Sequence, residues 1–147
     1  MADIHRVIDD SSPRDVFIEA GIYLENILDK YLERKFSLPS KAIEDPAFNL
    51  ELKIRIAEHA GFLVEPYRTN VREIQRIRNR YAHTLEPEEA AIRNMIDAME
   101  TTPAGSLNEK VEIDIFTKFK IKAVATLVEL SNAVEADRPL FVLAKSE

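Results

Sequence analysis

Residues 13–36, PRDVFIEAGIYLENILDKYLERKF, constrain the fold of this chain more than any other segment. Their apolar members recur at intervals of three and four, the spacing of one face of an α-helix; they are Phe17, Ala20, Leu24, Ile27, Leu28, Tyr31 and Leu32. Ser12 is placed to cap this helix, with Pro13 at its first position and Asp15 completing a capping box. A long helix with one apolar face has to bury that face against other elements.

Two further helices are predicted in the middle of the chain. The first covers about residues 48–60, with Phe48, Leu52, Ile56 and Ala60 as its apolar stripe, Leu50, Ile54 and Ala57 widening it, and Gly61 as a left-handed C-cap. A polar connection bracketed by Pro39 and Pro46 precedes it. The second begins at Pro66 and reaches about residue 82, and its core stripe is Val71, Ile74, Ile77 and Tyr81.

The carboxyl-terminal part predicts two more helices. The first of these helices begins at Pro87, and its apolar face consists of Ile92, Met95, Ile96 and Met99. The last helix covers about residues 108–136, and its inward-facing residues are Phe116, Phe119, Ala123, Leu127, Leu130 and Val134. Only 3 Gly stand against 7 Pro, which disfavours a turn-rich β fold. The predicted fold class is therefore all-α, an antiparallel bundle of four to five amphipathic helices joined by short connections.

A chain of 147 residues suits one domain. Residues 1–137 are predicted to form a single helical bundle, and residues 138–147 an apolar tail without helical period. The apolar stretch Leu140–Leu143 of that tail needs a cover, either its own bundle or a second subunit.

Composition disfavours several classes of function. The absence of Cys excludes disulfides and thiolate metal sites, and three widely spaced His make a histidine metal site improbable, so neither metal nor cofactor is predicted. The net charge of −6 disfavours a surface that wraps nucleic acid generally. The first residues lack a signal-peptide core, and no apolar run reaches the length of a membrane span. We expect a cytoplasmic protein without membrane contact.

The helix predicted from Pro66 carries a basic ribbon, Arg68, Arg72, Arg76 and Arg80, spaced four residues apart. Like charges at this spacing repel, and Glu65 and Glu73 are placed to offset Arg68 and Arg76 at three-residue spacing. The ribbon is a candidate binding surface for an acidic partner, although basic stripes are commonly solvated faces. On that second reading, removing the Arg76 side chain costs under about 0.5 kcal/mol of stability.

Arg78, Asn79 and His83 cluster near the end of the same helix. Asn79 and His83 are four residues apart and can touch, whereas Arg78 and His83 lie about 140° apart around the helix. The latter pair converges only if the helix ends near Ala82 or if the two meet across a dimer axis. The residues alone favour a structural role for Asn79 and His83, because both types often satisfy a helix carboxyl end.

Three segments give the chain a resemblance to the mannitol operon repressor family. They are SSPRDVFIEAGIYLENILDKYL, FNLELKIRIAEHAGFLVEPYRTNVREIQRIRNRYAH and IDIFTKFKIKAVATLVEL, of which the middle one is the most specific. The resemblance implies an all-helical protein without a recognisable DNA-reading helix, which takes part in transcriptional control through partners.

The run Arg78-Asn79-x-x-x-His83 also resembles the short motif of the HEPN superfamily, whose members include metal-independent ribonucleases that act as dimers. This resemblance implies that His83 is a general acid or base, that Arg78 stabilises charge on the phosphate and that Asn79 orients one of them. It also implies that Arg76 and Arg80 hold flanking phosphates of an RNA.

Two hypotheses result. The favoured one is a non-enzymatic regulatory or interaction protein that forms a homodimer or binds a protein partner. The alternative is a HEPN-type endoribonuclease, such as a toxin, or its inactive relative. Direct DNA reading is a weaker third, since Ile74, Ile77 and Tyr81 commit the basic helix to the core.

Overall fold

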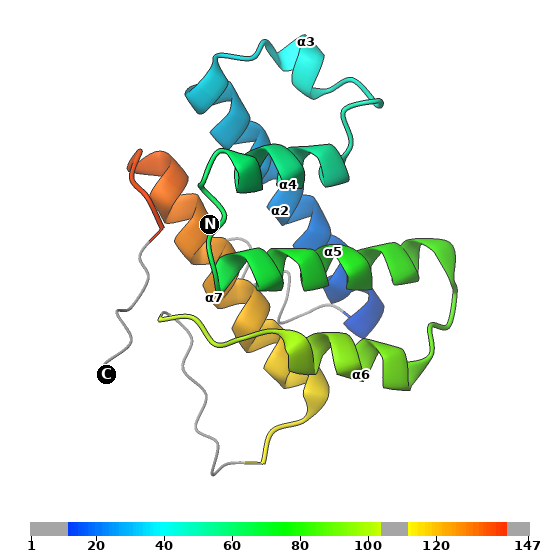
Figure 1. The fold of residues 1–147 in the computed structure, drawn as a ribbon. Coiled ribbons are helices and arrows are strands. Elements are labelled where there is room, and N and C mark those ends of the chain that lie inside the picture. Colours follow the sequence, from blue (N-terminus) through cyan, green and yellow to red (C-terminus); the bar gives the residue numbers. More distant parts are fainter. Residues whose placement is uncertain (1–11, 104–111, 141–147) are drawn as a thin grey trace.

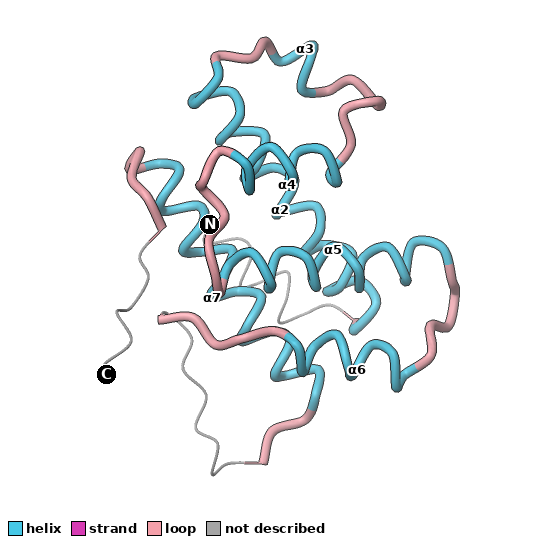
Figure 2. Tube along the Cα trace, viewed as in Figure 1, coloured by secondary structure: helices cyan, strands magenta, loops and turns pink. Residues whose placement is uncertain are grey.

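The computed structural model describes residues 12–103 and 112–140 (Figures 1 and 2). Within these ranges the chain forms six helices and no strand, which confirms the all-α prediction. The helices are α2 (Pro13–Phe36), α3 (Ser40–Ile43), α4 (Leu50–His59), α5 (Tyr67–His83), α6 (Glu89–Ala98) and α7 (Ile115–Glu135).

Helix α2 begins and packs as its sequence predicts. Ser12 is extended, and its hydroxyl accepts a hydrogen bond from the backbone N–H of Asp15 at 3.4 Å. All seven residues of the predicted apolar stripe are buried. The helix therefore presents one continuous apolar face, against which α4, α5 and α7 pack.

The long helices α2 and α7 run side by side in the same direction (Figure 1). Near their starts the Phe17 and Phe119 rings lie 4.6 Å apart, and near their ends the Arg34 guanidinium donates to the carbonyl of Val134 at 2.9 Å. Successive helices α4, α5 and α6 alternate in direction, as short connections require. The antiparallel prediction therefore applies to these neighbours, while α2 and α7 form a parallel pair.

Helix α4 packs on the core mainly through the residues that were predicted to widen its apolar stripe. Leu50, Ile54 and Ala57 are buried, whereas Leu52 is 39% exposed and Ala60 is exposed. Of the stripe that we expected to be central, Phe48 and Ile56 are partly buried against the core, while the residues expected to widen it are the most buried. Both sets are apolar, so the choice depends on the neighbouring helices rather than on α4 alone.

Two further features differ from the prediction. The connection between Pro39 and Pro46 contains the short helix α3. Helix α7 begins at Ile115, because Asp114 caps it by accepting from the N–H of Thr117 at 2.9 Å; residues 108–111 lie outside the described residues. Leu140 is buried, and the rest of the predicted tail, residues 141–147, lies outside the described residues.

Two buried polar residues tie α6 to the bundle. The amide of Asn70, wholly buried, pairs with both backbone groups of Glu100 (2.7 and 2.8 Å) and donates to Thr126 at 2.9 Å. The ammonium of Lys122 donates to the carbonyls of Ile96 and Met99 at 3.0 and 2.8 Å, which satisfies the carboxyl end of α6. No described helix combines the length and the apolarity needed to cross a membrane.

Candidate functional site

The basic ribbon of α5 is largely paired with carboxylates. Arg72 donates to both oxygens of Glu51 at 2.9 Å and also pairs with Glu58. Arg68 pairs with the second oxygen of Glu58 at 2.9 Å. Both glutamates belong to α4, which lies beside α5 (Figure 1). This part of the ribbon is therefore a junction between two helices of the same chain.

Glu51 is the centre of this junction. Besides Arg72 it accepts from the Gln75 amide at 2.7 Å and from Arg55 at 3.0 Å. The hydrogen bond from Gln75, followed by that from Arg72, lowers the pKa of Glu51 to about 2. Glu51 therefore remains charged at every pH at which the protein is normally studied, and it neutralises the arginines beside it.

The two carboxylates predicted to offset the ribbon within α5 behave differently. Glu73 pairs with Arg76 at 2.6 Å, as predicted. Glu65 is not the partner of Arg68 among the described ion pairs. Its carboxylate accepts hydrogen bonds from the backbone N–H and the hydroxyl of Thr69, at 3.3 and 2.6 Å. Glu65 thus satisfies the amino end of α5, because that end has free N–H groups and a positive dipole.

Glu73 is the most enclosed of these acids, with 7% of its side chain exposed. Burial raises its pKa above the ordinary value, although the charge and hydrogen bond of Arg76 act in the opposite direction. Arg76 is therefore more than a solvated cation, since it compensates a buried carboxylate.

The helix geometry does not bring Arg78 and His83 together within one chain. Helix α5 continues through His83 and is capped only by Thr84, so the early helix end that would bring Arg78 and His83 together does not occur. His83 is exposed, while Arg78 and Asn79 are half-buried. Among the described residues, the Arg78 guanidinium donates one hydrogen bond, a long one of 3.5 Å to the Asn79 amide oxygen.

In the described part of the chain, no carboxylate forms an ion pair with Arg78, Arg80 or His83. The carboxyl-terminal end of α5 therefore differs from the rest of the helix. Arg68, Arg72 and Arg76 are compensated, and the cations around the predicted motif are not.

Arg78 lines a cleft of about 320 Å³ between α2, α4 and the segment around α3. The other lining residues are Glu25, Asp29, Ile43, Glu44, Asp45, Pro46, Phe48, Asn49, Leu50 and Lys53. His83 is not among them. The cleft thus combines one uncompensated guanidinium with several carboxylates and an apolar wall.

Lys53 is the most buried charge of this cleft, at 3% exposure. Its ammonium bonds Glu25 at 2.7 Å and Asp29 at 2.8 Å. Burial alone lowers the pKa of Lys53, but the hydrogen bonds to Asp29 and Glu25 outweigh that effect and the pKa lies above its ordinary value. The sequence analysis did not identify this triad because it treated the most buried side of α4 as the margin of the apolar stripe. The signal was a lysine three residues after Leu50 and four before Ala57 on the buried side.

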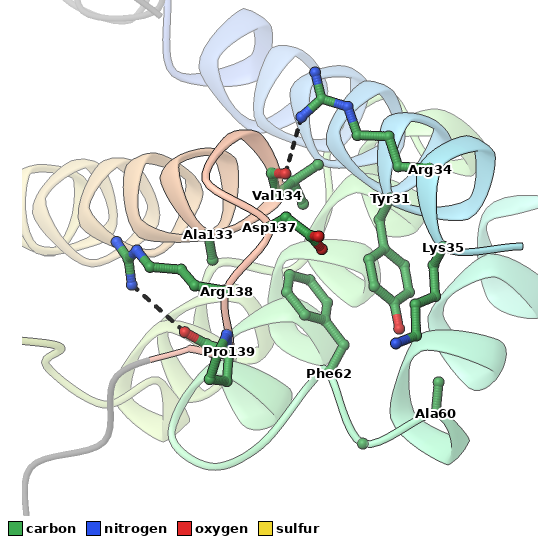
Figure 3. A pocket seen from close by; sticks show the side chains of 11 residues that line it. Tyr31, Arg34, Lys35, Ala60, Phe62, Ala133, Val134, Asp137, Arg138 and Pro139 are labelled. Atoms are coloured by element: carbon green, nitrogen blue, oxygen red, sulfur yellow. Dashed lines mark hydrogen bonds between the residues drawn. The ribbon is translucent and has the colours of Figure 1, made fainter.

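A second cavity, of about 270 Å³, lies where α2, α4 and α7 end (Figure 3). Tyr31 and Phe62 stack there at 4.3 Å, with Arg34, Lys35 and Arg138 around them. Arg34 is directed to the Val134 carbonyl, and the Arg138 guanidinium points away from the rings toward the carbonyl of Pro139, at 3.4 Å. These two arginines satisfy carbonyls near a helix end and do not converge on a ligand.

No cluster of three or more His, Asp or Glu side chains suited to a metal ion occurs in residues 12–103 and 112–140. Comparison of the chain with protein-family models, with curated proteins and with solved structures found no match.

Proposed function

We propose that this chain is a helical regulatory protein that acts through a protein partner and does not read DNA directly, as its resemblance to the mannitol operon repressor family implies. The observation that carries the proposal is the pairing of Arg68, Arg72 and Arg76 with carboxylates. A surface that binds nucleic acid needs arginines free to replace the counterions of phosphates. Most of the basic ribbon lacks that freedom.

An exposed apolar side chain beside the motif supports a protein contact. Leu85 is 81% exposed, the largest value among the large apolar side chains described. It lies two residues beyond His83, next to the uncompensated end of α5. The cores of protein interfaces are more apolar than the surrounding surface and are enriched in arginine. The end of α5 is therefore the surface that we assign to the partner.

The second candidate function is a HEPN-type ribonuclease. Arg78, Arg80 and His83 favour it, because they form no ion pair within residues 12–103 and 112–140, while the other arginines of α5 are compensated. Since Arg78 and His83 diverge by about 140° on one helix, an active site of this kind would combine residues of two chains. An obligatory dimer is therefore part of this candidate.

An RNA assay distinguishes the two functions. Purified wild type and His83→Ala are incubated with mixed RNA in the presence of EDTA, and solution mass is measured on the same samples. The regulatory function predicts intact RNA with both proteins. Cleavage by the wild type that is lost in His83→Ala, together with a dimeric mass, would establish the nuclease instead.

The partner surface has its own test. A photo-crosslinking residue at position 85 identifies a contacting protein in cells, and the complex is then rebuilt from purified components. Leu85→Asp is expected to abolish that complex, because it places a charge in an apolar contact. Leu52→Asp, at a side chain 39% exposed on α4, is the matched control and should leave the complex intact. Retention of the complex by Leu85→Asp would contradict the assigned surface.

A further inference from the structure

Arg78 is held in position by the helix beneath it. Gly21 lies in the middle of α2, and a Cβ added there would meet the Cγ of Arg78 at 2.5 Å and its Cβ at 3.1 Å. Glycine in a helix interior costs about 0.5–1 kcal/mol relative to alanine. The close contact between the Gly21 backbone and the Arg78 side chain explains why a glycine stands in this helix despite its lower stability. The stem of Arg78 is thus fixed against α2 before any ligand arrives.

Most hydrogen-bond donors of the Arg78 guanidinium are unused in the described contacts. A guanidinium carries five N–H donors, and the described contacts of Arg78 use one, in the long bond to Asn79. Two of the carboxylates that line the same cleft, Glu25 and Asp29, are paired with Lys53. A half-buried, pre-positioned guanidinium with free donors suits a planar group with two oxygens, which it can bind in a bidentate manner.

The cleft that Arg78 lines also has an excess of negative charge. Four carboxylates, those of Glu25, Asp29, Glu44 and Asp45, stand against Lys53 and Arg78. After the pairing of Lys53 with Glu25 and Asp29, the remaining acids are Glu44 and Asp45, both exposed. A ligand that brought only an anion would meet this excess, whereas a ligand that also carries a cation would be stabilised by it.

From this combination we propose that the cleft between α2, α4 and the α3 segment binds a free amino acid, with its carboxylate on Arg78 and its ammonium toward Glu44 and Asp45. The cleft volume of about 320 Å³ lies at the small end of ligand pockets, which suits a metabolite of this size. Ile43, Phe48 and Leu50 supply an apolar wall for the side chain of the ligand. This site shares Arg78 with the ribonuclease candidate, but neither His83 nor Leu85 is among its lining residues.

Thermal unfolding of the purified chain with each of the common L-amino acids, added singly, tests the site. At a concentration about tenfold above Kd, the Tm is expected to rise by roughly 4 °C for at least one of them. Calorimetric titration then gives its affinity. The amide of the same amino acid, which lacks the carboxylate, and its N-acetyl form, which lacks the ammonium, should each give no shift.

Variants connect the binding to Arg78. Arg78→Ala should abolish the shift, and Arg78→Lys should weaken binding at least tenfold because an ammonium cannot form the bidentate contact. Arg80→Ala is the matched control, an exposed arginine of the same helix that does not line the cleft, and it should bind as the wild type does. If Arg78→Ala does not fold, Arg78→Lys and the two ligand analogues carry the comparison. Absence of any shift, a shift that Arg78→Lys retains in full, or equal binding of the amide would each overturn the proposal.

Discussion

The side chain of Arg78 passes directly over Gly21, where a Cβ would lie 2.5 Å from the arginine Cγ and 3.2 Å from its Cδ. This relationship fixes how closely α2 and α5 approach at this level of the bundle. Arg78 is also one of the residues that line the cleft beside α4. A residue without a side chain on one helix thus determines the position of a charged group on another.

Alanine at position 21 tests this relationship by a double-mutant cycle. Gly21→Ala in the wild type should destabilise the protein, although alanine is the better helix former, because the methyl group displaces the stem of Arg78. In an Arg78→Ala background the same change should stabilise by about 0.5–1 kcal/mol. Urea unfolding of the four proteins measures both effects. Equal effects in the two backgrounds would mean that Arg78 is not what requires the glycine.

Asn70→Ala should be among the more damaging polar substitutions in the protein. It removes the hydrogen bonds to the partly buried backbone groups of Glu100 and to the buried hydroxyl of Thr126, so we expect a loss of about 1–3 kcal/mol. Urea unfolding monitored by circular dichroism gives the value. Asn94→Ala, at an exposed position of α6, is the control and should stay within about 0.5 kcal/mol of the wild type.

Arg76→Ala should lower the free energy of unfolding by more than the sequence predicts. An exposed arginine on a solvated face is expected to contribute under about 0.5 kcal/mol, but here its removal leaves the buried carboxylate of Glu73 unpaired. We expect a loss of about 1–3 kcal/mol at neutral pH.

The pH dependence of this loss follows from the pKa of Glu73, which burial already raises above its ordinary value. Without Arg76 that pKa rises further, so the folded protein binds the proton more tightly than the unfolded chain and is destabilised as the pH rises through the interval between the two pKa values. The deficit of Arg76→Ala relative to the wild type should therefore shrink as the pH falls toward about 4.5, the ordinary value for Glu, and be smallest at and below that pH. A deficit independent of pH would contradict this role of Arg76.

Glu51→Gln should show the opposite dependence on pH. The pKa of Glu51 is lowered to about 2 in the folded protein, so its stabilising effect is complete above the ordinary value of 4.5 and is lost as the pH falls through about 2. The variant should be less stable than the wild type at pH 7, and the difference should vanish near pH 2. Glu33→Gln, at an exposed site of α2, provides the control in the same unfolding experiments. A Glu51→Gln deficit that persists at pH 2 would contradict the ion-pair explanation.

The sequence was sufficient to locate the long helices and part of the candidate site. The spacing of apolar residues in α2, the serine cap before it and the left-handed Gly61 after α4 are local features, and each is found where predicted. Helical spacing also placed Arg78 and His83 about 140° apart, and the structure continues the helix through both. Local periodicity determines such properties because they depend on neighbours within one or two turns.

Only the tertiary structure decided which charges meet. Arg68 has a glutamate three residues before it, yet it pairs with Glu58 on another helix. The burial of Lys53 depends on the orientation of α4 in the bundle, which places its side chain against Glu25 and Asp29 of α2.

The physical reason is that an amphipathic sequence specifies an apolar arc and not the partner that covers it. The rotation of α4, the parallel arrangement of α2 and α7 and the cleft beneath Arg78 all arise from contacts between residues far apart in the chain. The sequence by itself therefore determined the helices and their caps. The packing of those helices against one another determined which arginines are compensated and which remain available to a ligand.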